Sequence, residues 1–111
     1  MSMAFYPATK QIKITRGDSG SKEITFRIDD EFYEMQEGDQ VNFGVKKNYE
    51  DPECLIKKTY TENPFILQLD PQDTKPLDFG DYVWDMQFVA ANGYTETFVK
   101  KKVFTVTEEV V

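Results

Sequence analysis

The feature that most constrains this chain is a period of two in its hydrophobic residues. Apolar and polar side chains alternate over residues 11–15, 23–29, 41–46 and 82–88. Such alternation places the apolar set on one face of a pleated strand, toward a core. The side chains expected to face inward are Ile12, Ile14, Ile24, Phe26, Ile28, Val41, Phe43, Val45, Tyr82, Trp84, Met86 and Phe88.

Three further segments complete the set of expected strands. Residues 55–56 and 65–69 are short apolar runs, and residues 94–107 are rich in Thr, Val and Phe. Three lysines at 100–102 interrupt the alternation of the last segment, which predicts a bulge or a switch between sheets there. No segment has sustained helical periodicity, and the one helical candidate, residues 73–77, is a single turn.

Turn residues separate these runs. A Gly-Asp-Ser-Gly sequence at 17–20 divides the first two strands, and residues 48–52 close the third. Asn63 precedes a proline and is therefore pushed out of the helical region. Asn92 and Gly93 predict a tight hairpin in which both turn residues have positive φ.

The chain of 111 residues has the length of one domain. About seven short strands without helices predict an all-β sandwich. The sequence around Tyr82 resembles the approach to a tyrosine corner, which specifies an immunoglobulin-like sandwich. We expect its hydroxyl to bond upstream backbone, with Leu77 and Trp84 packed beside it. The expected division is an N-terminal arm at 1–8, the sandwich at 9–107 and a C-terminal tail at 108–111.

Composition excludes several classes of function. Thirteen Lys and Arg against twenty Asp and Glu give a net charge of −7, which argues against nucleic-acid binding. The absence of histidine removes imidazole as a base, nucleophile or zinc ligand. A single cysteine, Cys54, allows no internal disulfide. No apolar run approaches membrane-spanning length, and the N-terminal residues do not resemble a secretion signal, so synthesis and folding in a cytoplasm are expected.

The lysines are clustered at 46–47, 57–58 and 100–102. Two interpretations remain open. The lysines are solvated and protect strand edges from aggregation. Alternatively, they form a basic patch that orients the subunit against an acidic or identical neighbour.

The other candidates for chemistry have structural explanations. Adjacent acids at 29–31, 70 with 73, and 78 with 81 fit surface turns, although a weak calcium site over 70–81 stays an alternative. Cys54 has no histidine partner, and the Arg-Gly-Asp tripeptide at 16–18 fits a turn. We therefore expect no enzymatic activity, no metal and no cofactor. Exposed aromatic side chains on one face would form a sugar-stacking platform; the candidates are Phe32, Tyr33, Tyr49, Tyr60 and Tyr94.

Five segments carry a family resemblance, in chain order: 12–19, 37–43, 69–77, 80–87 and 104–110. They include a Gly-Asp turn entering a strand, an Asp-Thr-Lys-Pro-Leu turn and a Gly-Asp-Tyr-Val-Trp-Asp-Met strand. In this order they resemble the immunoglobulin-like amino-terminal domain of phage baseplate upper proteins and related virion appendage proteins. The family has no catalytic residues to carry over.

The resemblance implies a non-enzymatic virion protein that docks on capsid or on tail and baseplate proteins as a decoration, collar or baseplate component. It implies repeated copies in a particle assembled in a bacterial cytoplasm, without nucleic-acid or membrane partners. The alternative is a carbohydrate-binding adhesion module of a phage particle. The candidate partner contacts are Phe5, Tyr6, Pro7, Lys100, Lys101, Lys102, Val110 and Val111.

Overall fold

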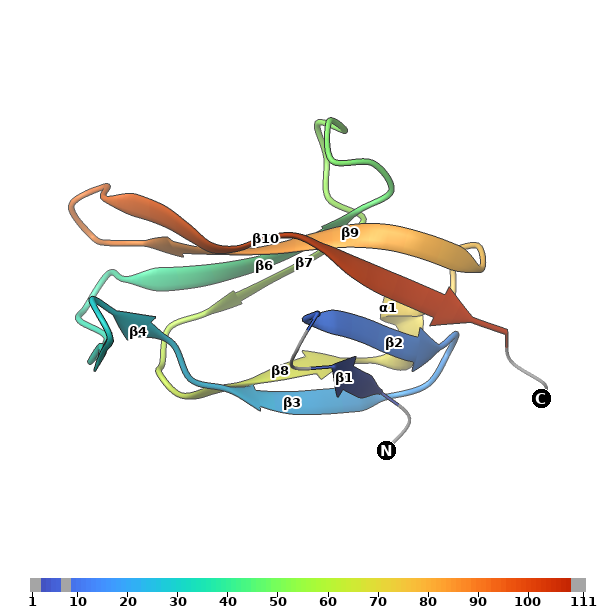
Figure 1. Cartoon of the computed structure of the whole chain (residues 1–111), viewed down its shortest axis with the longest axis horizontal. Coiled ribbons are helices and arrows are strands. Elements are labelled where there is room, and N and C mark those ends of the chain that lie inside the picture. Colours follow the sequence, from blue (N-terminus) through green and yellow to red (C-terminus); the bar gives the residue numbers. More distant parts are fainter. Residues whose placement is uncertain (1–2, 7–8, 109–111) are drawn as a thin grey trace.

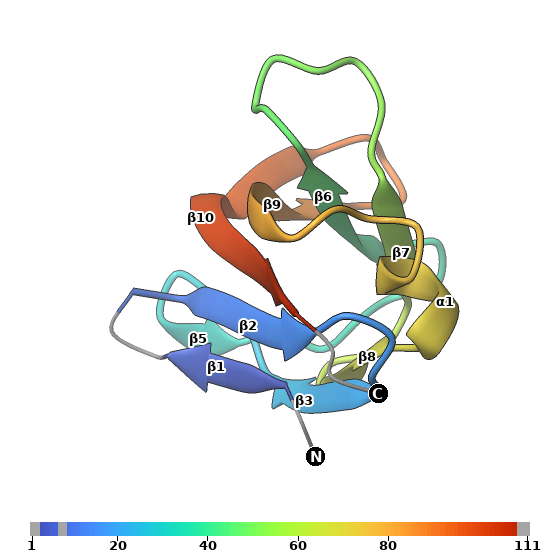
Figure 2. The same ribbon diagram turned by 90° about the vertical axis from the view of Figure 1, so that its right-hand side faces the viewer.

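A computed structural model describes residues 3–6 and 9–108 of the chain (Figure 1), which form an all-β fold, as predicted. A six-stranded sheet has the order β1-β2-β10-β9-β6-β7; its strands β6, β7 and β9 form one layer with β10, and its β1–β2 end lies beside β3 of the other layer (Figures 1 and 2). The other layer is a pair of strands, β3 and β8, and a third pair, β4 and β5, lies at one end (Figures 1 and 2). The bounds are β1 Ala4–Tyr6, β2 Gln11–Thr15, β3 Gly20–Ile24, β4 Arg27–Ile28, β5 Glu31–Phe32, β6 Gln40–Lys46, β7 Ile56–Tyr60, β8 Phe65–Leu69, α1 Pro71–Thr74, β9 Gly80–Val89 and β10 Thr95–Thr107.

The core lies between the two layers, and alternation builds it from both. On β6 and β9, every second residue is buried, and β8 contributes three buried side chains from the opposite layer. Burial of this apolar surface is the main favourable term in folding. The largest fully buried hydrophobic side chains are Trp84, Phe43, Phe104, Ile12, Ile14, Leu67, Leu69 and Met86.

The prediction of one continuous strand over residues 23–29 is wrong. The strand ends at Ile24, and only residues 27–28 resume it as β4. Between them the side-chain amide of Asn63 replaces a strand partner: Phe26 N donates to Asn63 Oδ1 (3.2 Å), and Asn63 Nδ2 donates to Phe26 O (3.0 Å). Phe26 remains buried, whereas Ile24 and Ile28 are half-buried. The alternation was correct for burial of Phe26 but concealed the break in the backbone.

Part of the expected N-terminal arm belongs to the sheet. Strand β1 pairs antiparallel with β2, with Ala4 opposite Lys13 and Tyr6 opposite Gln11. The other edge of β2 pairs in parallel with the end of β10. An edge left unpaired presents free backbone N–H and C=O groups, so pairing with β1 satisfies the second side of β2.

The lysine run at 100–102 forms a bulge in β10. The register with β9 shifts between Thr97 and Val99 and again between Val99 and Lys102. At the bulge Lys101 has a φ of 55°, and its backbone N–H donates to Asp85 Oδ1 (2.7 Å). At the bulge, the Lys101 backbone N–H therefore bonds to a side-chain carboxylate instead of to a backbone carbonyl of the neighbouring strand. Beyond the bulge, residues 104–106 pair with β2 as well as β9, and Thr107 pairs with β2.

The hairpin at Asn92-Gly93 forms, but its turn differs from the predicted one. Only Gly93 has positive φ (95°). Gly93 N donates to Ala90 O (2.9 Å), and Ala90 N donates to Tyr94 O (2.7 Å), so the loop is longer than two residues. Asn92 instead accepts a hydrogen bond at Oδ1 from Tyr94 N (3.0 Å). The prediction of positive φ at Asn92 is therefore wrong, because its side chain stabilises the loop in another way.

Tyr82 makes the hydrogen bond expected of a tyrosine corner. Its hydroxyl donates to Asp78 O (2.8 Å), four residues upstream, while the ring is buried. Leu77 and Trp84 belong to the same buried cluster. The hydrogen bond connects the segment before β9 to the beginning of that strand.

Tyr82→Phe should lower the free energy of unfolding by about 0.5–1.5 kcal/mol, because it removes one hydrogen bond and keeps the ring. Urea denaturation measures this change. The matched control is Tyr94→Phe, which removes a hydroxyl bonded to Glu96 Oε1 (3.0 Å) on an exposed side chain and should change stability by less than about 0.5 kcal/mol. Equal losses in the two variants would contradict a special role for the corner.

Candidate binding groove

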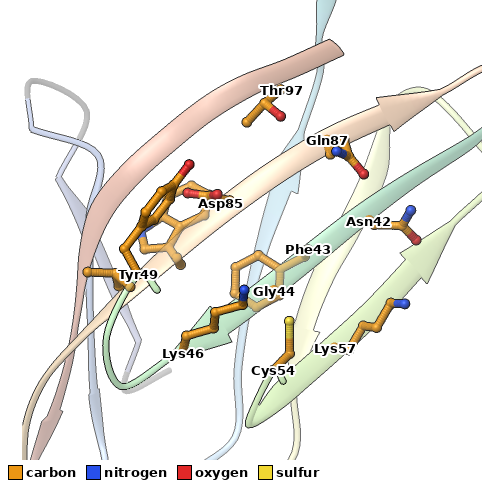
Figure 3. Close-up of a pocket in the computed structure, with 12 residues that line it drawn as sticks. Asn42, Phe43, Gly44, Lys46, Tyr49, Cys54, Lys57, Asp85, Gln87 and Thr97 are labelled. Carbon is orange, nitrogen blue, oxygen red and sulfur yellow. The ribbon is translucent and has the colours of Figure 1, made fainter. Parts of the chain in front are cut away.

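The outward-facing side of the six-stranded sheet carries a hollow of about 390 Å³ (Figure 3). Strand pairing sets its floor as rows of side chains across neighbouring strands. The first row runs Thr97, Gln87 and Asn42, and Thr59 continues it beyond the lining; the second runs Asp85, Gly44 and Lys57; the third pairs Val83 with Lys46. Each row takes the residues that alternation directs away from the core. We call this hollow the sheet groove.

Gly44 makes the depression in the middle of these rows. It is the one position of the floor without a side chain, and both of its neighbours in the row carry one. A Cβ placed there would lie 2.9 Å from Cys54 Sγ. The register of β6 with β7 and β9 is continuous through Gly44, so no bulge interrupts β6 at this glycine. The absence of a side chain at Gly44 instead leaves room for the Cys54 thiol to approach the strand.

The loop of residues 47–55 forms one wall of the sheet groove and stands out from the sheet (Figures 1 and 2). Its base is held by Leu55 N, which donates to Val45 O (2.7 Å), and by a turn in which Asn48 N donates to Asp51 Oδ2 (3.0 Å). Lys47 Nζ lies 4.6 Å from the centre of the Tyr82 ring and donates to Asp81 O (3.1 Å). These contacts place Tyr49 and Cys54 over the sheet.

The structure brings one lysine of each sequence cluster to this region. Lys46 and Lys57 line the sheet groove, and Lys101 Nζ lies 4.4 Å from the centre of the Tyr49 ring, within cation–π range. Asp85 is the one acidic residue lining the groove, and its Oδ1 already accepts the Lys101 N–H. Two lysines and one carboxylate therefore line the groove, and a third lysine lies over the Tyr49 ring, on a chain of net charge −7.

The predicted partner-contact residues are dispersed. Lys100 is exposed, Lys101 stacks on Tyr49, and Lys102 is half-buried opposite Trp84. Phe5 and Tyr6 lie in β1, opposite Ile12 and Gln11. Pro7 lies outside the described residues, and so do residues 109–111 of the expected tail, which include Val110 and Val111.

Other candidates from the sequence have structural partners. Asp73 Oδ2 accepts the Asp70 backbone N–H (2.7 Å) and pairs with Lys58 (2.9 Å), which accounts for two of the four acids where a calcium site was considered. The described part of the chain holds no cluster of three or more His, Cys, Asp or Glu side chains suited to a metal ion. In the Arg-Gly-Asp segment, Arg16 lies over the Phe79 ring at 4.5 Å, and Gly17 N donates to Thr74 Oγ1 (2.8 Å).

The exposed aromatic residues lie on separate elements. Phe32 is in β5, Tyr49 in the groove loop, Phe79 before β9 and Tyr94 after the hairpin turn. Tyr33 and Tyr60 are half-buried, and Tyr60 stacks on Phe65 at 4.4 Å. Of the aromatic candidates, Tyr49 lines the sheet groove.

Sequence reasoning did not identify Asn42 and Gln87 as site residues. Their outward direction is readable from the alternation of their strands, since each lies between two buried apolar residues. That they face each other across β6 and β9 depends on the register of two strands separated by more than thirty residues of chain.

Comparison with known proteins adds no relative: no protein-family model, curated protein or solved structure matches the chain. Among the described residues, no helix combines the length and apolar character that crossing a membrane requires.

Proposed function

We propose that the chain is a non-enzymatic structural protein of a phage particle, an immunoglobulin-like module that docks on capsid or on tail and baseplate proteins. The observation that carries the docking role is the free outer edge of β1 and of β7, the two end strands of the six-stranded sheet among the described residues. A free strand edge is a ready template for a partner strand, because its backbone groups pair without special side chains.

The strand order supports the immunoglobulin-like assignment. Strands β6, β9 and β10 lie side by side as C, F and G do in that fold, while β3 and β8 pair in the opposite layer as B and E do. The Tyr82 hydrogen bond to Asp78 O lies at the start of β9, the F-like strand. The virion assignment rests on the family resemblance of the five sequence segments.

Docking in a particle requires little affinity from each copy. Identical modules on a repeated lattice add their contacts through multivalency, so a short strand edge suffices. Lys100 adds an exposed positive charge near the bulge of β10, which favours an acidic neighbour and fixes its orientation.

The test is electron cryo-microscopy of phage particles produced with the gene intact and with it deleted. We expect density the size of one small domain to disappear from a repeated position on the capsid, collar or baseplate. Lys100→Glu should reduce incorporation, whereas Lys13→Glu, the same charge change at an exposed position of β2, should not. Identical maps from both kinds of particle would contradict a structural role in the virion.

A further inference from the structure

We propose that the sheet groove binds an acidic saccharide, a sugar unit that carries a carboxylate alongside its hydroxyl groups. This inference does not depend on the docking role, which uses strand edges and not the face of the sheet. The groove volume of about 390 Å³ lies in the range of small-molecule sites, roughly 300–1,000 Å³.

Charge indicates an anion. Neither Lys46 nor Lys57 forms an ion pair with a residue that the structure describes; the ion pairs there join Lys58 to Asp70 and Asp73. Lys101 adds a third ammonium group over the Tyr49 ring. Among the residues that line the groove, the two lysines Lys46 and Lys57 face the single carboxylate of Asp85, so the lining is net positive on a chain whose net charge is −7. The acids Glu50, Asp51 and Glu53 of the loop 47–55 lie outside this lining.

The uncharged side chains indicate hydroxyl groups on the same ligand. Thr97, Gln87 and Asn42 form one row along the floor (Figure 3). Asn42 Oδ1 accepts from Thr59 Oγ1 (2.8 Å), which leaves its NH₂ group to donate to a ligand. Asp85 uses Oδ1 for Lys101 N–H and retains an oxygen that accepts a hydroxyl proton. A bare anion without hydroxyls would meet only repulsion from that carboxylate.

The position of the groove favours a saccharide over an acidic peptide. The middle of its floor is built on β6 and β9, which are interior strands paired on both sides, and β10 and the end strand β7 each add one lining residue. The backbone N–H and C=O groups of β6 and β9 are already used in the sheet, so a peptide lying across them finds no backbone partners. A saccharide needs none, because its hydroxyls bond to side chains such as the amides of Asn42 and Gln87.

Cys54 provides a direct readout, since it is exposed, lines the groove and is the only cysteine of the chain. The experiment measures alkylation of the purified full chain by iodoacetamide, with and without a galacturonate tetramer. A galactose tetramer and a glutamate tetramer serve as the neutral sugar and the acidic peptide. For each variant the ratio of rates with and without the probe is compared, which cancels any direct effect of a substitution on thiol reactivity.

We expect the galacturonate tetramer to slow alkylation in a saturable way and the other two probes to require at least about tenfold higher concentration, equivalent to about 1.4 kcal/mol. Lys57→Glu should weaken this protection about tenfold or more, and Lys13→Glu, the same charge change four strands away on β2, should preserve it. Gln87→Leu should weaken it at unchanged charge.

Two results would overturn the proposal. Equal protection by the glutamate tetramer would identify the groove as an acidic-peptide site. The absence of protection by galacturonate at concentrations that leave the protein folded would exclude the acidic saccharide. Neither result bears on incorporation into particles, so failure here is distinguishable from failure of the docking role.

Discussion

Replacing Trp84 by alanine should lower the free energy of unfolding by about 3–5 kcal/mol, the usual cost of removing a large aromatic side chain from a core. Trp84 is 2% exposed and lies 5.5 Å from Phe43, ring centre to ring centre. Its indole Nε1 donates to Lys10 O (3.0 Å), which ties β9 to the turn before β2. The free energy of unfolding of a single domain is only about 5–15 kcal/mol, so the variant should lose a large fraction of its stability.

Far-UV circular dichroism with urea measures this loss, because the variant lacks the only tryptophan of the chain and has no indole fluorescence. Val103→Ala is the matched control on neighbouring β10: its side chain is 40% exposed, and the expected change is within about 0.5 kcal/mol. A Trp84→Ala variant as stable as the Val103→Ala variant would show that the two layers do not enclose this residue.

Asp39→Asn should lower the free energy of unfolding by about 1.5–3 kcal/mol, the range for hydrogen bonds to a charged group. Asp39 is 3% exposed and joins three parts of the chain. Its Oδ2 accepts from the Tyr33 hydroxyl (2.6 Å) and from Gln36 N (2.9 Å), and its Oδ1 accepts from Ala91 N (3.0 Å). An amide nitrogen at either position turns an acceptor into a donor facing another donor.

The same contacts make stability depend on pH. The Tyr33 hydroxyl, together with the Gln36 and Ala91 N–H groups, lowers the pKa of Asp39 below its usual value, because all of them favour the carboxylate. A lowered folded-state pKa contributes stability that is present above the unfolded-state pKa of about 3.9 and is lost as pH falls through the folded-state value. Urea titrations between pH 7 and pH 2 should therefore show a smaller acid loss for Asp39→Asn than for the parent chain. Glu37→Gln, an exposed acid of the same turn, should keep the parent slope.

Local features of this fold were readable from residue order. Alternation depends only on the two-residue repeat of a strand, so the buried residues of β6 and β9 and the all-β class follow from it. The bulge in β10 was readable for the same reason, since three successive lysines cannot alternate with apolar residues. The break after Ile24 was not, because its cause is Asn63, a residue nearly forty positions away that bonds to Phe26.

For the sheet groove too, part of the arrangement was readable from residue order and part was not. That Asn42, Gly44 and Gln87 point away from the core is a local property of their strands. Their assembly with Lys57 and Thr97 into one surface is not, because it depends on pairing β6 with β9 and β7, and β9 with β10. Alternation excludes a slip by one residue, which would turn the apolar side chains outward, but a slip by two residues keeps every side chain on its face. The alternation of strands far apart in the chain therefore does not decide which of their residues lie opposite each other. Residue order thus determined which side chains are buried, and only packing of the two layers decided which exposed ones meet.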